Sequence, residues 1–158
     1  PWQFPEKLIP VMAIAAMAGR PLPIYGKGEN ERDWLHVEDH ASALSEVMTR
    51  GRLGESYNIG GNAERMNVEV VHAICAFMDR EVPSGAPHEK LIEHVTDRPG
   101  HDKRYAIDPA KIRTELGWEP QEPIESGLEG TLRWYRDNAD WWQAIRAGRY
   151  DGRRLGTG

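Results

Sequence analysis

RDWLHVEDHASALSEVMTRG, residues 32–51, is the stretch that most clearly indicates the fold. Its first part, RDWLHV, alternates and is rich in strand-forming residues, which predicts a β-strand. Its second part places Ala41, Leu44 and Met48 on one face of a helix, and Gly51 follows as a stop signal. The stretch therefore predicts a strand followed by a helix.

The same alternation continues on both sides of this stretch. Further strands are expected at SYNIGG and LIEHVT, and PLPIYGKG predicts a short edge strand or loop. Further helices are expected over PEKLIPVMAIAAMAG and after Asn67, Asp108 and Pro123, the last of these running toward Trp141 and Trp142. Alternating strands and helices predict an α/β fold. The strands are too few for a complete doubly wound sheet, so we expect part of a larger fold.

Two of these helices carry a clear apolar stripe. The helix from Asn67 is expected to bury Val71, Ile74, Cys75 and Met78. The helix after Pro123 places on one face Ile124, Leu128, Thr131, Leu132 and Tyr135.

Composition limits the classes of partner. Hydrophobic residues make up 39% of the 158 residues and charged residues 28%, as in ordinary globular proteins. The formal net charge of -5 argues against nucleic acid as a partner. Cys75 is the single cysteine, which fits a reducing, cytoplasmic setting. No apolar run approaches the ~20 residues that span a bilayer, so no membrane partner is expected.

The motifs of dinucleotide chemistry are missing from the sequence. GKGENE, residues 26–31, lacks the third glycine of a pyrophosphate-binding turn, and GRLGESYNIGG, residues 51–61, lacks its spacing. No tyrosine is followed by a lysine four residues later, so the base of a short-chain dehydrogenase is also missing. HVEDH, residues 36–40, matches neither HExxH nor HxxEH, so no metal is expected there.

Three stretches gather cationic and polar groups that suit a phosphorylated ligand. PEKL contains Lys7, RDWLH contains Arg32, and DRPGHDKRY contains Arg98, His101, Lys103 and Arg104. Guanidinium groups can bind a diphosphate through paired hydrogen bonds. The alternative is that they are surface charges paired with neighbouring carboxylates, such as Asp33, Asp97 and Asp102. The residues alone leave both interpretations open.

Five motifs together carry a family resemblance. FPEKLIP, LPIYGKG, RDWLHVEDHASAL, YNIGG and DRPGHDKRYAID resemble, in this order, the C-terminal half of the dTDP-glucose 4,6-dehydratases, which are extended short-chain dehydrogenases/reductases. FPEKLIP together with DRPGHDKRYAID is the more specific combination, because related extended short-chain dehydrogenases carry variants of RDWLHVED and YNIGG. The tail after Tyr150 departs from the family pattern.

The resemblance implies a fold and an activity for a larger parent enzyme. Residues 1–158 would form its C-terminal nucleotide-sugar-binding region, with the substrate-binding lobe and the last strands and helices of the Rossmann domain. The N-terminal half, with bound NAD and the catalytic residues, would be absent from this chain. The parent would oxidise the sugar at C4, eliminate water across C5 and C6, and return the hydride to C6. It would be a cytoplasmic homodimer that binds dTDP-glucose or dTDP.

The resemblance also implies a set of substrate-binding residues. The thymine and deoxyribose would contact Lys7, Leu8, Pro23, Ile24 and Tyr25. The diphosphate would be bound by Arg32 and Arg98, with a hydrogen bond from Asn67 and with His101 closing the pocket; Asp97, Pro99 and Gly100 would shape the turn. Ordinary packing of Tyr25, and a helix-capping role for Asn67, are the alternatives.

Two other functions are compatible with these motifs. The chain could be a free-standing nucleotide-sugar-binding module without catalysis. It could also be part of an epimerase, decarboxylase or dehydratase that acts on UDP or GDP sugars, although DRPGHDKRY favours the dTDP-glucose enzymes.

Overall fold

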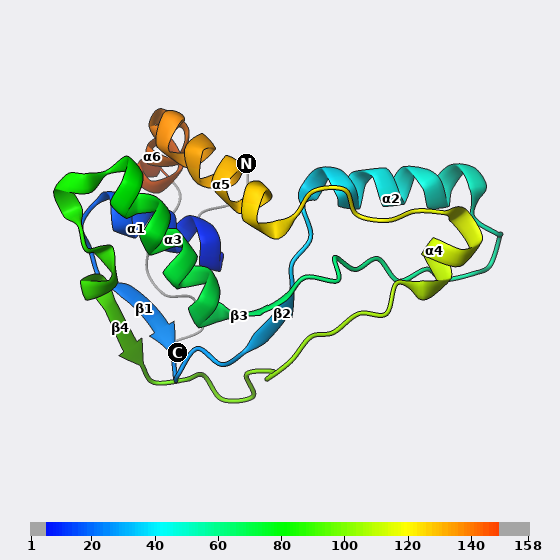
Figure 1. Cartoon of the computed structure of the whole chain (residues 1–158), viewed down its shortest axis with the longest axis horizontal. Coiled ribbons are helices and arrows are strands. Elements are labelled where there is room, and N and C mark those ends of the chain that lie inside the picture. The colour runs from blue at the N-terminus through cyan, green and yellow to red at the C-terminus, as the bar shows by residue number, and fades with distance from the viewer. Residues whose placement is uncertain (1–5, 149–158) are drawn as a thin grey trace. The chain divides into compact units, whose positions relative to one another are not determined.

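The computed structural model describes residues 6–148, which divide into two compact units (Figure 1). Within the described residues, unit 1 comprises 6–28, 67–99 and 129–148, and unit 2 comprises 29–66 and 100–128. The motif residues Phe4 and Pro5, and the tail after Tyr150, lie outside the described residues.

Unit 1 is built around a short parallel sheet and two packed helices. Strand β1 (Leu22–Tyr25) pairs with β4 (Ile92–Val95), with Leu22 opposite Ile92 and Tyr25 opposite Val95. Helix α1 (Leu8–Met17) packs on α3 (Asn67–Glu81). The segment between α3 and β4 forms two 3-10 turns, η1 (Pro83–Gly85) and η2 (His88–Leu91). PLPIYGKG is therefore a strand followed by a turn.

The core of unit 1 confirms the helical periodicity of the sequence. All four residues of the predicted α3 stripe, Val71, Ile74, Cys75 and Met78, are fully buried. Helix α5 (Ile124–Asp137), which crosses from unit 2 into unit 1, buries Leu132 and Tyr135 as predicted. The chain then starts a separate helix, α6 (Ala139–Gly148), which contains Trp141 and Trp142.

The turn after β1 requires glycine at position 28. Gly28 has a φ of +74°, and a Cβ atom there would lie 2.7 Å from the Ile24 side chain and 2.8 Å from Val68. Both the left-handed backbone and the close packing exclude a larger residue. The amide of Val68 donates to the Gly28 carbonyl at 3.0 Å, which ties this turn to the start of α3.

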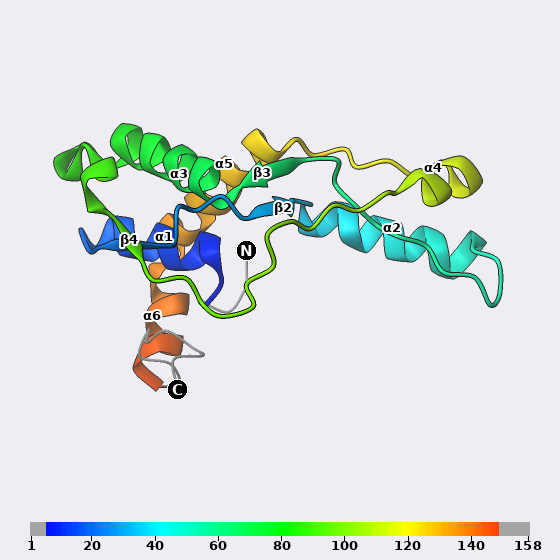
Figure 2. The same ribbon diagram turned by 90° about the horizontal axis from the view of Figure 1, so that it is seen from below.

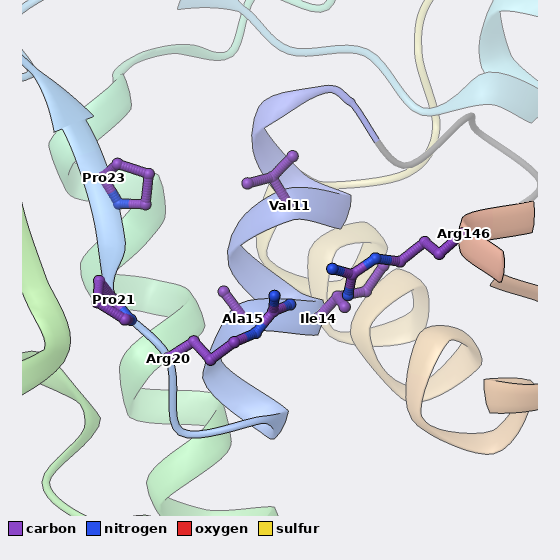
Figure 3. A pocket seen from close by; sticks show the side chains of 7 residues that line it. All are labelled: Val11, Ile14, Ala15, Arg20, Pro21, Pro23 and Arg146. Carbon is purple, nitrogen blue, oxygen red and sulfur yellow. The ribbon is translucent and has the colours of Figure 1, made fainter. Parts of the chain in front are cut away.

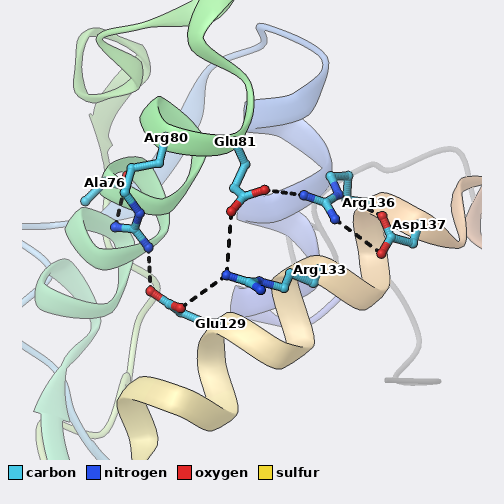
Figure 4. A network of polar contacts seen from close by, with 7 residues as sticks. All are labelled: Ala76, Arg80, Glu81, Glu129, Arg133, Arg136 and Asp137. Atoms are coloured by element: carbon cyan, nitrogen blue, oxygen red, sulfur yellow. Dashed lines mark hydrogen bonds and ion pairs between the residues drawn. The ribbon is translucent and has the colours of Figure 1, made fainter.

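An ion-pair network joins the end of α3 to α5 within unit 1 (Figure 4). Arg80 pairs with Glu129, and Arg136 pairs with Glu81. Arg133 lies 3.6 Å from both glutamates. Because these side chains are partly exposed, each pair contributes about 0–1 kcal/mol, and the network mainly orients the two helices.

Unit 2 has a smaller sheet and a thinner core. Strand β2 (Glu31–Asp33) pairs antiparallel with β3 (Glu64–Met66). Helix α2 (Val37–Arg50) packs against α4 (Ala110–Leu116), and both are labelled in Figure 2. As predicted, α4 follows Asp108 and Pro109 and ends at Gly117. The core consists of four buried side chains: Ala43, Ile112, Leu116 and Trp118.

For unit 2, one expected strand is shorter than predicted and two other expectations are wrong. The strand in RDWLHV ends at Asp33, so His36 is the residue that precedes α2. SYNIGG, residues 56–61, forms no strand, because no other strand of the described chain pairs with it. The predicted apolar face of α2 is not buried, because Leu44 is 46% exposed and Met48 is 86% exposed. The helix instead buries Asp39 and Ala43.

Candidate functional site

Arg32 in β2 is the most firmly positioned cation of the predicted site. Its Nη1 donates to the Glu31 carbonyl at 2.6 Å and its Nη2 to the Asp102 carbonyl at 3.0 Å. The guanidinium also lies 4.3 Å from the ring centroid of Tyr105. These contacts fix the side chain with backbone oxygens and an aromatic face, so its positive charge is not neutralised by them.

His101 completes this arrangement within unit 2. Its Nε2 lies 3.1 Å from Arg32 Nη2. A guanidinium only donates hydrogen bonds, so Nε2 accepts and the proton of the ring is on Nδ1. The structure therefore brings together Arg32 and His101, two of the residues that the resemblance assigns to the diphosphate.

Asp33, which the alternative interpretation offered as a partner for the neighbouring cations, does not pair with Arg32. Asp33 Oδ2 accepts from the amide of Gly61 at 2.9 Å, and its Oδ1 accepts from the amide of Ala63 at 3.0 Å. A Cβ on Gly61 would lie 2.0 Å from the Trp34 carbonyl, so the glycine of YNIGG is needed for this contact. Asp33 and Gly61 thus hold the loop that precedes β3 against β2.

Arg104 has a structural role that the sequence did not distinguish from that of its neighbours. It pairs with Glu64 at 2.6 Å and with Glu31 at 2.8 Å, and so ties β3 and β2 to the segment after Lys103. The hydrogen bond that Arg104 donates to Glu64, with a smaller contribution from the bond to Glu31, raises the pKa of Arg104 above its ordinary value. Lys103 contributes its carbonyl, which accepts from the amide of Glu31 at 2.8 Å.

In unit 1, the residues of β1 that are predicted to bind the nucleoside lie on opposite faces of the strand. Ile24 is buried in the core at 2% exposure, whereas Pro23 and Tyr25 are half-buried on the opposite face. Lys7 and Leu8 lie at the start of α1, and Lys7 pairs with Glu6 at 2.8 Å. Pro23 and Tyr25 can therefore contact a ligand directly, while Ile24 supports the strand from behind.

The other predicted residues of unit 1 lie at the start of α3 and after β4. Asn67 is the first residue of α3. Asp97 accepts from the amide of Arg98 at 2.8 Å, and Pro99 is exposed. The Arg98 side chain is also exposed, and no carboxylate of the described residues pairs with it. Gly100, with a φ of +68°, is already in unit 2.

Tyr105 and the Asp102 carbonyl are the contacts that sequence reasoning missed. Both lie in the DRPGHDKRY motif and both hold Arg32, as described above. Nothing in the sequence around Tyr105 indicates that its ring will contact Arg32 in β2.

The described residues do not fit the pyrophosphate of NAD. Such a site needs a glycine-rich turn between a strand and a helix. The turn at Gly26–Gly28 leads from β1 to β2, and β3 passes directly into α3, with Met66 and Asn67 adjacent. The junction from β2 to α2, residues 34–36, contains no glycine, and the segment from β4 to α4 contains Gly100 alone, so no strand-to-helix junction of the described residues offers the required turn.

Residues 6–148 contain no helix with the length and hydrophobicity of a membrane span, and no three of their His, Cys, Asp or Glu side chains cluster as metal ligands. His36 precedes α2 and His40 lies within it.

The family is decided by comparison with known proteins. Residues 1–131 match the family model described as GDP-mannose 4,6 dehydratase. The chain belongs to this family. Among curated relatives, dTDP-glucose 4,6-dehydratase of Neisseria meningitidis serogroup B is 57% identical over 100% of this chain and 46% of its own length. That of Escherichia coli is 54% identical over 99% and 44%. The resemblance inferred from the five motifs is thus confirmed.

Solved structures of the family confirm the α/β fold. The dTDP-glucose 4,6-dehydratase of Bacillus anthracis in complex with NAD has 50% identity and a TM-score of 0.83, over 92% of this chain and 44% of that one. The enzyme of Streptomyces venezuelae, with NAD and TYD bound, has 41% identity and a TM-score of 0.85, over 92% and 43%. The chain thus spans less than half the length of these family members.

Proposed function

We propose that this chain is the nucleotide-sugar-binding part of a dTDP-glucose 4,6-dehydratase, corresponding to its C-terminal portion. The observation that carries the proposal is identity of 57% and 54% to two such enzymes over essentially the whole chain. The missing glycine-rich turn supports the C-terminal assignment, since NAD would be bound by the other portion. The parent would be an NAD-dependent lyase and a homodimer in the cytoplasm.

The diphosphate of the ligand would be bound by Arg32 and Arg98. Both side chains are free of carboxylate partners among the described residues, so neither charge is already neutralised. Guanidinium groups donate charge-assisted hydrogen bonds to phosphate oxygens. His101 would close the pocket beside Arg32, and Asn67 would add a neutral hydrogen bond at the start of α3, where helix amides favour an anion.

The nucleoside would contact the exposed face of β1 and the start of α1. Pro23 and Tyr25 lie on that face. The ring of Tyr25 can stack on a base, a contact worth about 1–3 kcal/mol. Lys7 and Leu8 would border the deoxyribose, and Ile24 would keep β1 in place. Asp97, Pro99 and Gly100 would set the shape of the turn that presents Arg98.

Calorimetric titration of the chain with dTDP-glucose tests the assignment of the cations. Arg32→Ala and Arg98→Ala should each weaken binding by about 1.5–3 kcal/mol, the worth of a hydrogen bond to a charged group. Lys103→Ala is the matched control, because it removes one positive charge from the same motif without removing an assigned contact. A larger loss for Lys103→Ala than for the arginine variants would show that the wrong cations were assigned.

Turnover by the isolated chain is the second test. Hydride transfer needs a bound dinucleotide and a positioned base, and the sequence offers neither the turn nor the tyrosine and lysine pair. Mixed with dTDP-glucose and excess NAD, the purified chain should yield no 4-keto product, measured by its absorbance in alkali. Product above a no-protein control, from material of verified mass, would contradict the proposal.

A further inference from the structure

A pocket in unit 1 brings together two arginines that have no part in the proposed nucleotide-sugar site. Arg20 follows α1, and Arg146 lies in the last turn of α6. Both line a pocket of about 220 Å³. Figure 3 shows the two side chains extending toward each other across the C-terminal part of α1. Residues far apart in sequence thus place two guanidinium groups at one opening.

Neither guanidinium has a carboxylate partner among the described residues. The contrast with the ion-pair network between α3 and α5 is clear, because Arg80, Arg133 and Arg136 all pair with glutamates. Burial, and then the charge of Arg146, lowers the pKa of Arg20 from its ordinary value. The carbonyl end of a helix favours one nearby cation, but it does not explain why two cations converge.

The walls of the pocket are apolar. Val11, Ile14 and Ala15 come from α1, and Pro21 and Pro23 border the pocket on the other side. Ile14 and Ala15 are almost completely buried, so this wall is a rigid part of the core. An apolar wall below two guanidinium groups suits a ligand with an anionic head and a small apolar body.

We propose that this pocket binds the phosphate group of a small organic phosphate monoester. A phosphate carries a charge of about -1.5 to -2 at pH 7 and three acceptor oxygens, so one group can balance both arginines. A carboxylate would leave one positive charge unbalanced. The apolar body of the ester would pack on Val11 and Pro21, which are not fully buried, and inorganic phosphate cannot do this.

Titration of the 158-residue chain with phenyl phosphate tests the proposal, with binding followed by NMR of the arginine Nε–Hε groups. The signals of Arg20 and Arg146 should shift together and saturate. Arg20→Gln and Arg146→Gln should each weaken binding about tenfold. Arg133→Gln is the matched control, since it removes an equal charge from unit 1 outside the pocket and should leave the affinity unchanged.

Two further ligands identify what the pocket recognises. Inorganic phosphate and benzoate should each bind more weakly than phenyl phosphate, the first for lack of an apolar body and the second for lack of charge. Equal binding of inorganic phosphate would overturn the assignment of a monoester. Binding that survives both arginine substitutions, or no binding at millimolar concentration, would overturn the site itself. Arg98→Ala should not change phenyl phosphate binding, which separates this result from that of the proposed function.

Discussion

Unit 1 and unit 2 differ in how they use their apolar residues. In unit 1, α3 buries six side chains, and five of the ten residues of α1 are buried hydrophobics. In unit 2, the core cluster has four buried members. The exposed large hydrophobic side chains of the described chain all belong to unit 2, and they are Val37, Leu44, Met48, Leu53, Tyr105 and Ile107.

The difference shows which of the predicted apolar stripes find a packing partner within the described residues. The stripe of α3 meets α1 and becomes a core, whereas Leu44 and Met48 of the predicted α2 stripe stay exposed. Residues 57–60 also lack a paired strand, but Tyr57 and Ile59 are partly buried and pack against the core cluster of unit 2. The exposed stripe of α2 is a patch of the kind that promotes association with other surfaces.

The largest expected effect is on stability, and it distinguishes a substitution in α3 from one in α2. Ile74→Ala in α3 removes a fully buried side chain and should lower the free energy of unfolding by about 2–5 kcal/mol. Met48→Ala in α2, where the side chain is 86% exposed, should change it by less than about 0.5 kcal/mol. Urea unfolding followed by circular dichroism measures both. Equal losses would remove the distinction between the units.

A smaller effect is expected at the buried polar contact of unit 2. Asp39, 6% exposed, accepts from the amides of Gln121 and Glu122 at 3.0 and 2.9 Å. Asp39→Ala leaves both amides without this partner, so it should cost about 1–3 kcal/mol. The neighbouring Glu38→Ala, at an exposed position of the same helix, is the control. If both variants unfold at the wild-type urea concentration, unit 2 does not depend on this contact.

The smallest effect concerns acid sensitivity in unit 1. The ring and amide of His88 contact Asp79 at 2.6 and 2.8 Å, and these hydrogen bonds hold the pKa of Asp79 below its ordinary value. A carboxylate with a lowered pKa stabilises the fold at pH values above its pKa in the unfolded chain, about 3.9. This stability is lost as the pH falls through the pKa of the folded state.

Asp79→Asn should therefore lose less stability than the wild type when the pH is lowered from 5 to below about 4. Glu93→Gln, at an exposed position of β4, should behave like the wild type. Thermal unfolding across this pH range gives the measurement. An unchanged pH dependence in Asp79→Asn would mean that the pair with His88 does not contribute.

Sequence alone predicted the parts of the fold that depend on local pattern. The stripe at Val71, Ile74, Cys75 and Met78 has a helical period that needs only one apolar partner surface. Strands need a hydrogen-bonded neighbour, and nothing in YNIGG records whether that neighbour is present. The pairing of β2 with β3 was missed for the same reason, because three-residue strands carry almost no periodicity.

The candidate site was predicted residue by residue but not as contacts. DRPGHDKRY showed a concentration of cations, yet only the structure separates Arg104, which is paired with Glu31 and Glu64, from Arg32, which is held by backbone carbonyls. Arg32 and His101 are 69 positions apart, and Arg20 and Arg146 are still farther. Such contacts follow from the tertiary fold, which motif spacing does not encode.

The preference of the chain for the thymine nucleotide is the sharpest test of the proposed nucleotide-sugar site. Calorimetric titrations with dTDP, UDP and GDP under the same conditions compare three nucleosides that carry the same diphosphate. We expect dTDP to bind most tightly, because Lys7, Leu8, Pro23 and Tyr25 are the proposed contacts of thymine and deoxyribose, and we expect Tyr25→Ala to reduce this preference. Equal affinity for dTDP and UDP, unchanged by Tyr25→Ala, would contradict the proposed site.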